Sequence, residues 1–429
     1  PSPPPPCPPP PPPPTPQPPP APLQPGERWG TYLIELNFTY PGTKSRIEEN
    51  SKTPVGTTTD TKVPAVFVDI NKDSFMDLVT KRSLFLGTET ETGVLSDVPI
   101  TIGTEPDEFS SITVTDMNQD ELDDIVVSYK TNPTTPLLQQ GVKVFYNPGS
   151  SDFSNVLGIK VGGMLQATQK VVVFDMNGDG KKDIIAANKN QPNKVFLAKS
   201  TYSKTFDDGH TFGTEEDDTT DIVIADVLSA PGNEIVVANK GTTNKIYTFE
   251  ADTRTVYIGE EPVTIGTEVD DTTVIVVTDV NTPTPDGLKD IVVGNSKQAN
   301  KLYMHPGVSD EGEEGSFASV TPFSIGSQTD DTRSLVVETF SAVETGYTKK
   351  IFVANAGEQN KIYSIPSAPS PMSGIAETTP MSIGVETDDT KSLIVADASQ
   401  PGDGDLDVIT VNQGGVKTYM NPGSDDFSA

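Results

Sequence analysis

The sequence predicts an all-β protein, a seven-bladed β-propeller of four-stranded blades preceded by an extended polyproline II arm. Three observations support this prediction. A short acidic phrase recurs between two runs of β-branched residues, its copies follow at a nearly constant period, and 18 of the first 25 residues are proline. Acidic loops between β-branched runs indicate strand, loop and strand rather than helix. We therefore expect an arm at 1–28, a strand segment at 29–56 and the propeller at 57–429.

The first segment, PSPPPPCPPPPPPPTPQPPPAPLQP, has the composition of polyproline II and cannot form a packed core. At about 3.1 Å per residue it would reach on the order of 75 Å. Its SPPPP phrase resembles the extensin and pherophorin motif of plant and green-algal hydroxyproline-rich glycoproteins. That resemblance implies hydroxylated, arabinosylated prolines and a galactosylated serine, at Ser2, Pro3, Pro4, Pro5 and Pro6. The alternative is an unmodified proline linker or an SH3-type ligand.

The strand segment contains TYLIELNFTY at 31–40. Alternation along a strand places one set of its side chains on a common face, namely Tyr32, Ile34, Leu36, Phe38 and Tyr40. Asn37 lies on the other face and begins the N-glycosylation sequon NFT. The last unit of the chain stops soon after GVKTYM, and SKTPVG at 51–56 precedes the first unit as TPMSIG precedes the last. We expect residues 50–56 to complete the seventh blade, which leaves the strand at 31–40 spare.

The repeated phrase is most regular in DMNGDGKKD at 175–183, and single copies of such a phrase are usually polar turns. Here it recurs as DINKDSFMD (69–77), DMNQDELDD (116–124), DVNTPTPDGLKD (279–290) and DASQPGDGDLD (397–407). Glycine stands thirteen residues before the first position of six units, at Gly56, Gly103, Gly162, Gly213, Gly266 and Gly384, and Gly326 has the same relation to Thr339. The seven units begin at intervals of 47 to 60 residues. This period indicates a propeller, solenoid or array, and four strands per unit favour the propeller over a β-helix.

The phrase D-x-N-x-D-G-x-x-D between the first two strands of such a unit resembles the FG-GAP repeat. That repeat forms the blades of integrin α-subunit propellers and of many secreted algal and bacterial proteins, and the resemblance covers residues 56–429. It implies one calcium ion in the loop of each intact blade. The residue types support this independently, because calcium takes six to eight oxygen ligands and alternating acidic side chains on a tight loop can converge on one ion. Magnesium, which prefers compact octahedral sites that retain water, is the poorer candidate.

We expect five calcium sites, with side-chain oxygens from four positions of each loop. The candidate ligands are Asp69, Asn71, Asp73 and Asp77; Asp116, Asn118, Asp120 and Asp124; Asp175, Asn177, Asp179 and Asp183, with the carbonyl of Lys181; Asp279, Asn281, Asp286 and Asp290; and Asp397, Ser399, Asp403 and Asp407. Ser74 and Glu121 replace the loop glycine in two copies. Two units should bind no ion, because the fourth has Leu228 and Ala230 at ligand positions and the sixth, TFSAVETGYTKK, has no ligand set.

The composition bounds the functional classes. A net charge of -31 excludes a general nucleic-acid binder, which needs a basic stripe, and no apolar run is long enough to span a membrane. The single cysteine, Cys7, excludes an internal disulfide framework and is a candidate for an intermolecular disulfide. The first residue is Pro1 and no apolar leader follows it, from which we expect a processed, secreted protein. The two resemblances imply the extracellular matrix or cell surface of a green alga or similar eukaryote.

We predict that the protein is not an enzyme. Its two histidines, His210 and His305, stand in unrelated contexts, and no nucleophile, phosphate-loop or zinc-protease phrase occurs. We expect a structural glycoprotein, a calcium-stabilised subunit of a fibre or matrix that assembles with itself through the N-terminal arm and the spare strand. The alternative is a lectin or integrin-like adhesion module that binds matrix polysaccharide, although the sole Trp29 lies outside the repeats. A glycosidase or a calcium-dependent polysaccharide lyase is the remaining enzymatic alternative.

Overall fold

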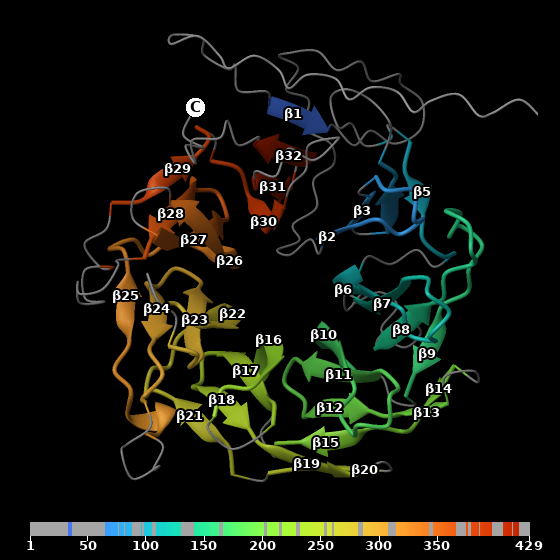
Figure 1. Ribbon diagram of the computed structural model, residues 1–429, viewed down its shortest axis with the longest axis horizontal. Coiled ribbons are helices and arrows are strands. Elements are labelled where there is room, and N and C mark those ends of the chain that lie inside the picture. Colours follow the sequence, from blue (N-terminus) through green and yellow to red (C-terminus); the bar gives the residue numbers. More distant parts are fainter. Residues whose placement is uncertain are drawn as a thin grey trace, which may run out of the picture.

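The computed structural model describes residues 33–36 and most of residues 65–419, with the longer gaps at 88–95, 105–108, 130–140, 163–165, 201–203, 214–216, 229–231, 282–285, 308–314, 343–345, 366–374, 376–378 and 397–405. The predicted polyproline II arm lies outside the described residues. Antiparallel sheets of four strands are arranged in a ring around a common axis (Figure 1). The described residues contain strands and one short 3-10 helix, η1 (Phe317–Ser319), so the fold is an all-β propeller.

Six sheets, called blades one to six here, are each built from four strands in chain order. They comprise β2 (Ala65–Val68), β3 (Asp77–Thr80), β4 (Ser83–Phe85) and β5 (Ile100–Thr101); β6 (Phe109–Thr115), β7 (Asp124–Tyr129), β8 (Val142–Phe145) and β9 (Ile159–Val161); β10 (Thr168–Phe174), β11 (Asp183–Asn188), β12 (Asn193–Phe196) and β15 (His210–Phe212); β16 (Asp218–Ala225), β17 (Glu234–Lys240), β18 (Asn244–Tyr247) and β21 (Val263–Ile265); β22 (Thr272–Thr278), β23 (Asp290–Asn295), β24 (Asn300–Tyr303) and β25 (Phe323–Ile325); and β26 (Thr332–Ala342), β27 (Gly346–Asn355), β28 (Asn360–Ser364) and β29 (Met381–Ile383). Blades three and four each carry an additional hairpin, β13 (Ala198–Ser200) with β14 (Thr205–Phe206) and β19 (Phe249–Asp252) with β20 (Thr255–Ile258).

The prediction of a seven-bladed propeller is wrong, because the structure forms six blades of four strands in chain order. Its last three strands, β30 (Thr390–Ala396), β31 (Asp407–Asn412) and β32 (Gly415–Tyr419), make an incomplete sheet. The fourth strand of this sheet is β1 (Leu33–Leu36), which comes from the N-terminal segment. We call this sheet the composite sheet. The repeat in the sequence marks the first strand and loop of each unit, so it counts units without showing whether each has a fourth strand of its own.

The pairing of β1 also corrects the prediction for ring closure. Leu33 pairs with Tyr419 and Leu36 with Val416, so β1 occupies the edge position beside β32 that was assigned to residues 50–56. Residues 50–56 themselves lie outside the described part of the chain. The first strands of the composite sheet and of blade one, β30 and β2, are in contact. The strand that the sequence left spare is therefore used within its own propeller.

The second strand of each blade forms the centre of the core. The strands β7, β11, β23 and β31 are buried at every residue. Their sequences, such as DIIAAN and DIVVGN, are nearly continuous apolar runs because both faces of the strand are covered by neighbouring sheets. Apolar clusters accordingly span the boundaries between blades, as where Val126 and Val144 of blade two pack with Val171 and Ile184 of blade three.

A buried belt of threonine and asparagine side chains joins successive blades. In blade five, Thr272 Oγ1 donates to Asn295 Oδ1 at 3.0 Å, and the N–H of Asn295 donates to Asn300 Oδ1 at 2.8 Å. Asn300 Nδ2 then donates to Thr332 Oγ1 of blade six at 3.0 Å, where the pattern begins again. The belt continues from blade three to the composite sheet through Thr168, Asn188, Asn193, Thr219, Asn239, Asn244, Thr272, Asn295, Asn300, Thr332, Asn355, Asn360, Thr390 and Asn412.

The acidic DDT phrase that precedes the innermost strands has a structural partner of its own. Its first aspartate pairs with the lysine that follows the second asparagine of the belt, as in Lys245 with Asp217 at 2.7 Å. Lys301 and Lys361 pair with Asp270 and Asp330 in the same way. In the composite sheet, Lys417 follows Val416 instead and pairs with Asp388 at 2.7 Å. These acids therefore belong to the framework of the blades. Among the described residues, no helix is long and apolar enough to cross a membrane.

Candidate metal centres

The acidic loop connects the first and second strands of a blade, and blades one, two and three share one loop geometry. In blade three, Asp175 Oδ1 and Asn177 Oδ1 both accept the N–H of Asp179, at 3.2 and 3.1 Å. The corresponding oxygens share the N–H of Asp73 in blade one and of Asp120 in blade two. Two oxygens that share one N–H must lie close together. The first two predicted ligands of each loop therefore converge.

The third predicted ligand turns toward the same group. Its second carboxylate oxygen accepts the amide N–H of the loop asparagine, from Asn71 to Asp73 at 2.9 Å and from Asn118 to Asp120 at 2.9 Å. Asn177 and Asp179 make this contact at 3.3 Å, and Lys181 Nζ also pairs with that oxygen of Asp179. Each loop thus gathers two carboxylates and one amide around its centre.

Two residues in each of these loops have left-handed backbone conformations. The fourth and sixth positions have φ between 61 and 81°, at Lys72, Ser74, Gln119, Glu121, Gly178 and Gly180. The sixth residue donates its N–H to Oδ2 of the first aspartate, at 2.9 Å in blade two and 2.8 Å in blade three. This bond helps to offset the cost of a left-handed conformation in a residue with a side chain. Ser74 and Glu121 consequently keep the loop geometry that glycine has in blade three.

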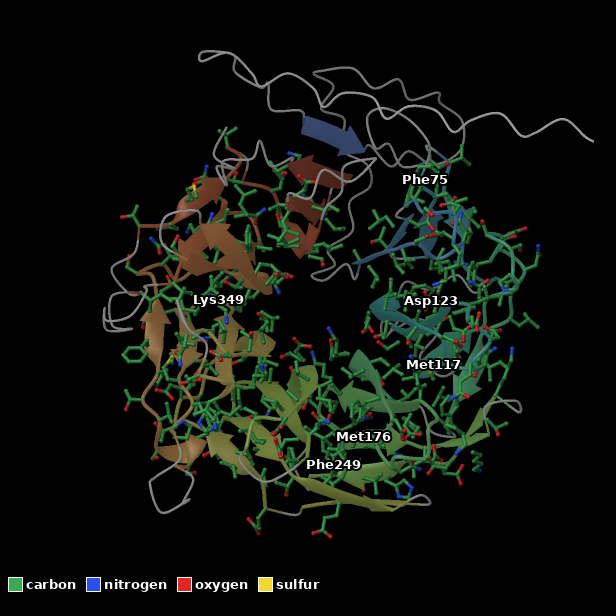
Figure 2. All side chains as sticks on the ribbon, viewed as in Figure 1. Phe75, Met117, Asp123, Met176, Phe249 and Lys349 are labelled. Carbon is green, nitrogen blue, oxygen red and sulfur yellow. The ribbon has the colours of Figure 1, made fainter. Side chains whose placement is uncertain are left out.

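An apolar second residue anchors each loop to the core. Ile70, Met117 and Met176 are at most 5% exposed, and each packs in the apolar cluster shared with the following blade. Figure 2 labels Met117 and Met176. Val227 and Val280 have the same position in blades four and five. The loop therefore alternates outward oxygen-bearing residues with an inward apolar one.

The last aspartate of the loop holds the backbone on both sides of it. Asp124, which is fully buried, accepts the N–H of Met117 at 2.9 Å and the N–H of Asn147 at 2.7 Å. Asp77, Asp183 and Asp290 make the same pair of bonds in their blades. Burial raises the pKa of Asp124 to about 6 and that of Asp183 to about 7, against the two N–H bonds that favour the carboxylate. The last aspartate therefore has a structural role. That it also binds calcium stays a prediction, and so does calcium binding by the Lys181 carbonyl.

Blade four separates the anchoring role of this carboxylate from metal binding. Its loop has lost the ligand set, yet Glu234 stands where the other blades have the last aspartate and is 3% exposed. Glu234 Oε2 accepts the N–H groups of Val227 and Leu228, at 2.9 and 3.1 Å. A carboxylate at this position is therefore retained where calcium ligands are absent.

Blade five keeps the loop contacts despite its insertion. Asp279 accepts the N–H groups of Asn281 and Gly287, at 3.0 and 2.8 Å, and Asn281 donates to Asp286. The inserted residues 282–285 lie outside the described part. In the composite sheet, Asp397, Ser399 and Asp403 are also outside it, whereas Asp407 is fully buried at the start of β31.

Blade six has replaced the acidic loop by a longer hairpin. The pairing of β26 with β27 continues to Ala342 and Gly346, through the region where other blades have the loop. Lys350 precedes Ile351 as Asp290 precedes Ile291 in blade five, so a base occupies the position of the anchoring acid. The neighbouring Lys349 is 8% exposed, and its Nζ donates to the backbone carbonyl of Asp279 in blade five (Figure 2).

The donor set of the loops fits calcium in chemical type. Calcium prefers carboxylate, amide and carbonyl oxygens, which are the groups that the first, third and fifth loop residues bring together. Within the described ranges, no three Asp, Glu, His or Cys side chains form a group that could hold a metal ion by themselves. Because the last aspartate faces the backbone, an ion in the loop would rely on two carboxylates, the asparagine oxygen and further oxygens from the backbone or water.

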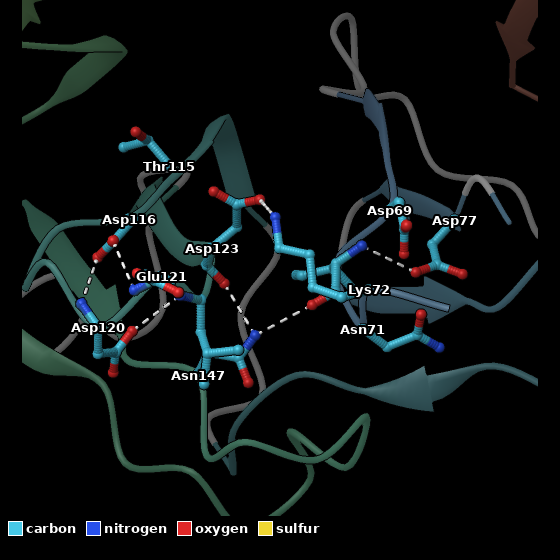
Figure 3. Close-up of polar contacts among 12 residues, drawn as sticks. Asp69, Asn71, Lys72, Asp77, Thr115, Asp116, Asp120, Glu121, Asp123 and Asn147 are labelled. Carbon is cyan, nitrogen blue, oxygen red and sulfur yellow. Dashed lines mark hydrogen bonds and ion pairs between the residues drawn. The ribbon is translucent and has the colours of Figure 1, made fainter. Parts of the chain in front are cut away.

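Side chains cross the boundary between neighbouring loops, a feature that the sequence analysis missed. Lys72 in the loop of blade one pairs with Asp123 in that of blade two at 2.8 Å, and Asn147 Nδ2 donates to the carbonyls of Ile70 at 3.2 Å and Asp123 at 3.0 Å (Figure 3). From blade two, Gln119 Nε2 donates to the Gly180 carbonyl of blade three at 2.5 Å. Asn147 begins an NPG phrase that recurs at 421–423.

The remaining predicted sites fall outside the described residues. These are the glycosylation candidates Ser2, Pro3, Pro4, Pro5, Pro6 and Asn37, and the disulfide candidate Cys7. The two histidines are far apart in the fold. His210 on β15 pairs with Asp207 at 2.7 Å, and the His305 ring stacks edge to face on Phe317.

Comparison with known proteins defines the fold class. No family model matches the chain, and no curated protein matches it. Its structure is similar to that of BBS1N in a crystal structure with ARL6DN, with a TM-score of 0.52 and 11% identity over 88% of this chain and 97% of that one. It is also similar to the Myceliophteria thermophila Cps50 (Swd1) β-propeller domain, with a TM-score of 0.47 and 10% identity over 85% of this chain and 97% of that one. The ring of four-stranded sheets and the likeness to BBS1N support the β-propeller fold, while the FG-GAP and hydroxyproline-rich resemblances stay predictions.

Proposed function

We propose that this protein is a non-enzymatic, calcium-stabilised propeller of the extracellular matrix or cell surface. The observation that carries the proposal is the shared geometry of three consecutive loops, in which two oxygens converge on the N–H of Asp73, Asp120 or Asp179. Three loops with different sixth residues would not adopt one geometry if they were ordinary polar turns. In blade five, Asp279 accepts the N–H groups of Asn281 and Gly287 on the two sides of the insertion, which supports the proposal further.

Calcium, when bound, would supply positive charge and a coordination shell that link the first, third and fifth residues of a loop. The chain's own residues do the positioning. The left-handed residues bend the loop, the apolar second residue fixes it to the core, and the last aspartate holds its backbone. A ligand that binds only the folded state stabilises that state, by about 2.7 kcal/mol per independent site at 100 times its dissociation constant.

The extracellular assignment depends on calcium and on the two resemblances. Weak calcium sites suit an extracellular setting, where sites with dissociation constants of about 0.1–1 mM are found. The fibre hypothesis has lost one premise, because the strand at 33–36 is paired with β32 of the same chain. Self-assembly through the proline arm is retained as a proposal. Negative-stain microscopy of the full chain and of a variant without residues 1–28, which retains β1, would test it.

Thermal unfolding with and without calcium tests the proposed function. We expect the melting temperature of the full chain to rise by several degrees in excess calcium over EGTA, and much less in magnesium. The variant Asp179→Ala should lose part of this increment. Asp152→Ala is the control, because Asp152 is an exposed acid that accepts the N–H of Ser154, two residues ahead of it, as the partly buried Asp179 accepts that of Lys181. Equal melting in calcium and EGTA would refute the proposal.

Binding of a macromolecular partner is the second candidate function. BBS1N, which shares the fold, was solved in complex with ARL6DN, so propellers of this shape can mediate protein interactions. The integrin-like and lectin-like alternatives belong to the same class. A glycan array and a matrix-protein array, each probed in calcium and in EGTA, would support this candidate through calcium-dependent binding at micromolar concentration.

A further inference from the structure

The loops of blades one, two and three are consecutive, and each boundary between them is bridged by side chains. Lys72 and Gln119 both occupy the left-handed fourth position of their loops. Each reaches the loop of the next blade, Lys72 through the Asp123 carboxylate and Gln119 through the Gly180 carbonyl. In return, Lys182 of blade three donates to Thr115 Oγ1, the residue just before the blade-two loop.

Asn147 makes a second bridge, which runs through the anchoring carboxylates. Its backbone N–H donates to Asp124 Oδ1, and the other oxygen of Asp124 holds the N–H of Met117 in the blade-two loop. Its side-chain amide donates to the carbonyl of Ile70, whose own N–H is held by Asp77 in blade one. A shift of either loop therefore moves a group to which the other loop is hydrogen-bonded.

The loop of blade five is separated from this group. Blade four, which lies between, has Leu228 where a ligand would be needed. The blade-five counterpart of Asn147 is His305, which makes the same contacts within its own blade, since its N–H donates to Asp290 and its Nδ1 accepts the N–H of Gly307. The group that reaches the blade-five loop from blade six is the ammonium of Lys349.

We propose that the loops of blades one, two and three bind calcium as one coupled unit, with Lys72, Gln119 and Asn147 as positioning residues, and that the loop of blade five binds independently. The inference rests on the proposed calcium function and adds a regulation to it. Calcium in one loop fixes the backbone that these bridges contact, and the neighbouring loop is then ordered at lower cost. Such coupling gives positive cooperativity, typically five- to 150-fold in affinity.

The test is a calcium titration by calorimetry of the full, metal-free chain. We expect a Hill coefficient above one for one group of sites and a separate, non-cooperative phase. The key variant is Asn147→His, the residue that blade five has at this position, because it keeps the backbone contacts and removes the amide donor to Ile70. It should lower the Hill coefficient, and Lys72→Met should do so less. The matched control is Lys297→Met, an exposed lysine with nearly the same left-handed φ, 58° against 61° for Lys72, in a turn away from the loops.

A double-mutant cycle separates coupling from damage to the fold. Asp116→Ala removes the first candidate ligand of blade two and should weaken calcium binding in blades one and three about fivefold or more. In a protein that already carries Asn147→His, Asp116→Ala should weaken calcium binding in blade one much less. Melting of Asn147→His in EGTA should match that of Lys297→Met. Three or more independent sites with equal affinities in the wild type would overturn the coupling and leave the calcium function intact, whereas no calcium heat at all would overturn both.

Discussion

Replacing Asp124 by alanine tests the anchoring role of the last loop aspartate. The change leaves two buried N–H groups, of Met117 and Asn147, without their acceptor, at about 1–3 kcal/mol each. The change also removes a buried charge, which partly offsets this loss. Burial raises the pKa of Asp124 from 3.8 to about 6, so the ionised carboxylate destabilises the folded state by about 3 kcal/mol. The two N–H groups together cost about 2–6 kcal/mol, and relief of the buried charge returns about 3 kcal/mol, so the expected net loss at neutral pH is centred on about 1 kcal/mol and does not exceed about 3 kcal/mol.

Urea unfolding in EGTA and in calcium measures both parts of this prediction. The matched variant is Glu234→Ala, which removes the corresponding acceptor in a blade without ligands. Asp124→Ala should be destabilised in EGTA and further in calcium, whereas Glu234→Ala should lose the same amount in both. An unfolding free energy of Asp124→Ala more than about 1 kcal/mol above that of the wild type in EGTA would refute the anchoring role.

Three further predictions concern pH, the belt and blade six. Because burial raises the pKa of Asp77, Asp124 and Asp290 to about 6, the folded protein binds more protons than the unfolded chain between about pH 4 and 6. The urea midpoint of the calcium-free protein should fall as pH rises through this window, and a midpoint that rises would contradict the assignment. Thr272→Val leaves the belt partners of a buried hydroxyl unsatisfied and should cost about 1–3 kcal/mol by urea unfolding, against nearly nothing for the exposed Thr267→Val. Lys349→Met removes a buried ammonium beside the blade-five loop and should raise calcium affinity there, so an unchanged titration would show that this lysine does not act on the loop.

The sequence was sufficient where structure depends on local pattern. Alternating oxygen-bearing residues and the glycines of DMNGDGKKD predicted a tight loop between two strands, and Asp175, Asn177 and Asp179 do converge there. The apolar runs after each loop predicted second strands, as in DIIAAN, and the structure shows this strand to be buried. These features need only the chemistry of neighbouring residues.

The features that the sequence did not reveal depend on contacts between blades. Asp124 and Asp120 are the same residue type four positions apart. Asp124, at the start of a buried strand, accepts the backbone N–H groups of Met117 and Asn147, whereas Asp120 also accepts the side-chain amide of Asn118 within the loop. The partners of Asn147 and Lys72 come from another blade. The strand at 33–36 has no mark in its sequence that distinguishes an edge beside β32 from an edge in a neighbouring molecule.

The composite sheet gives this ring a mechanical weak point. Its fourth strand is held by the hydrogen bonds between β1 and β32, in which Leu33, where the N-terminal segment enters, pairs with Tyr419 in the last strand. Tension between the two ends of the chain would therefore load this ladder at one end and open its pairs one after another, instead of loading them all together. Force on the proline-rich segment would peel β1 away while the six contiguous blades, joined through the chain itself, stayed folded.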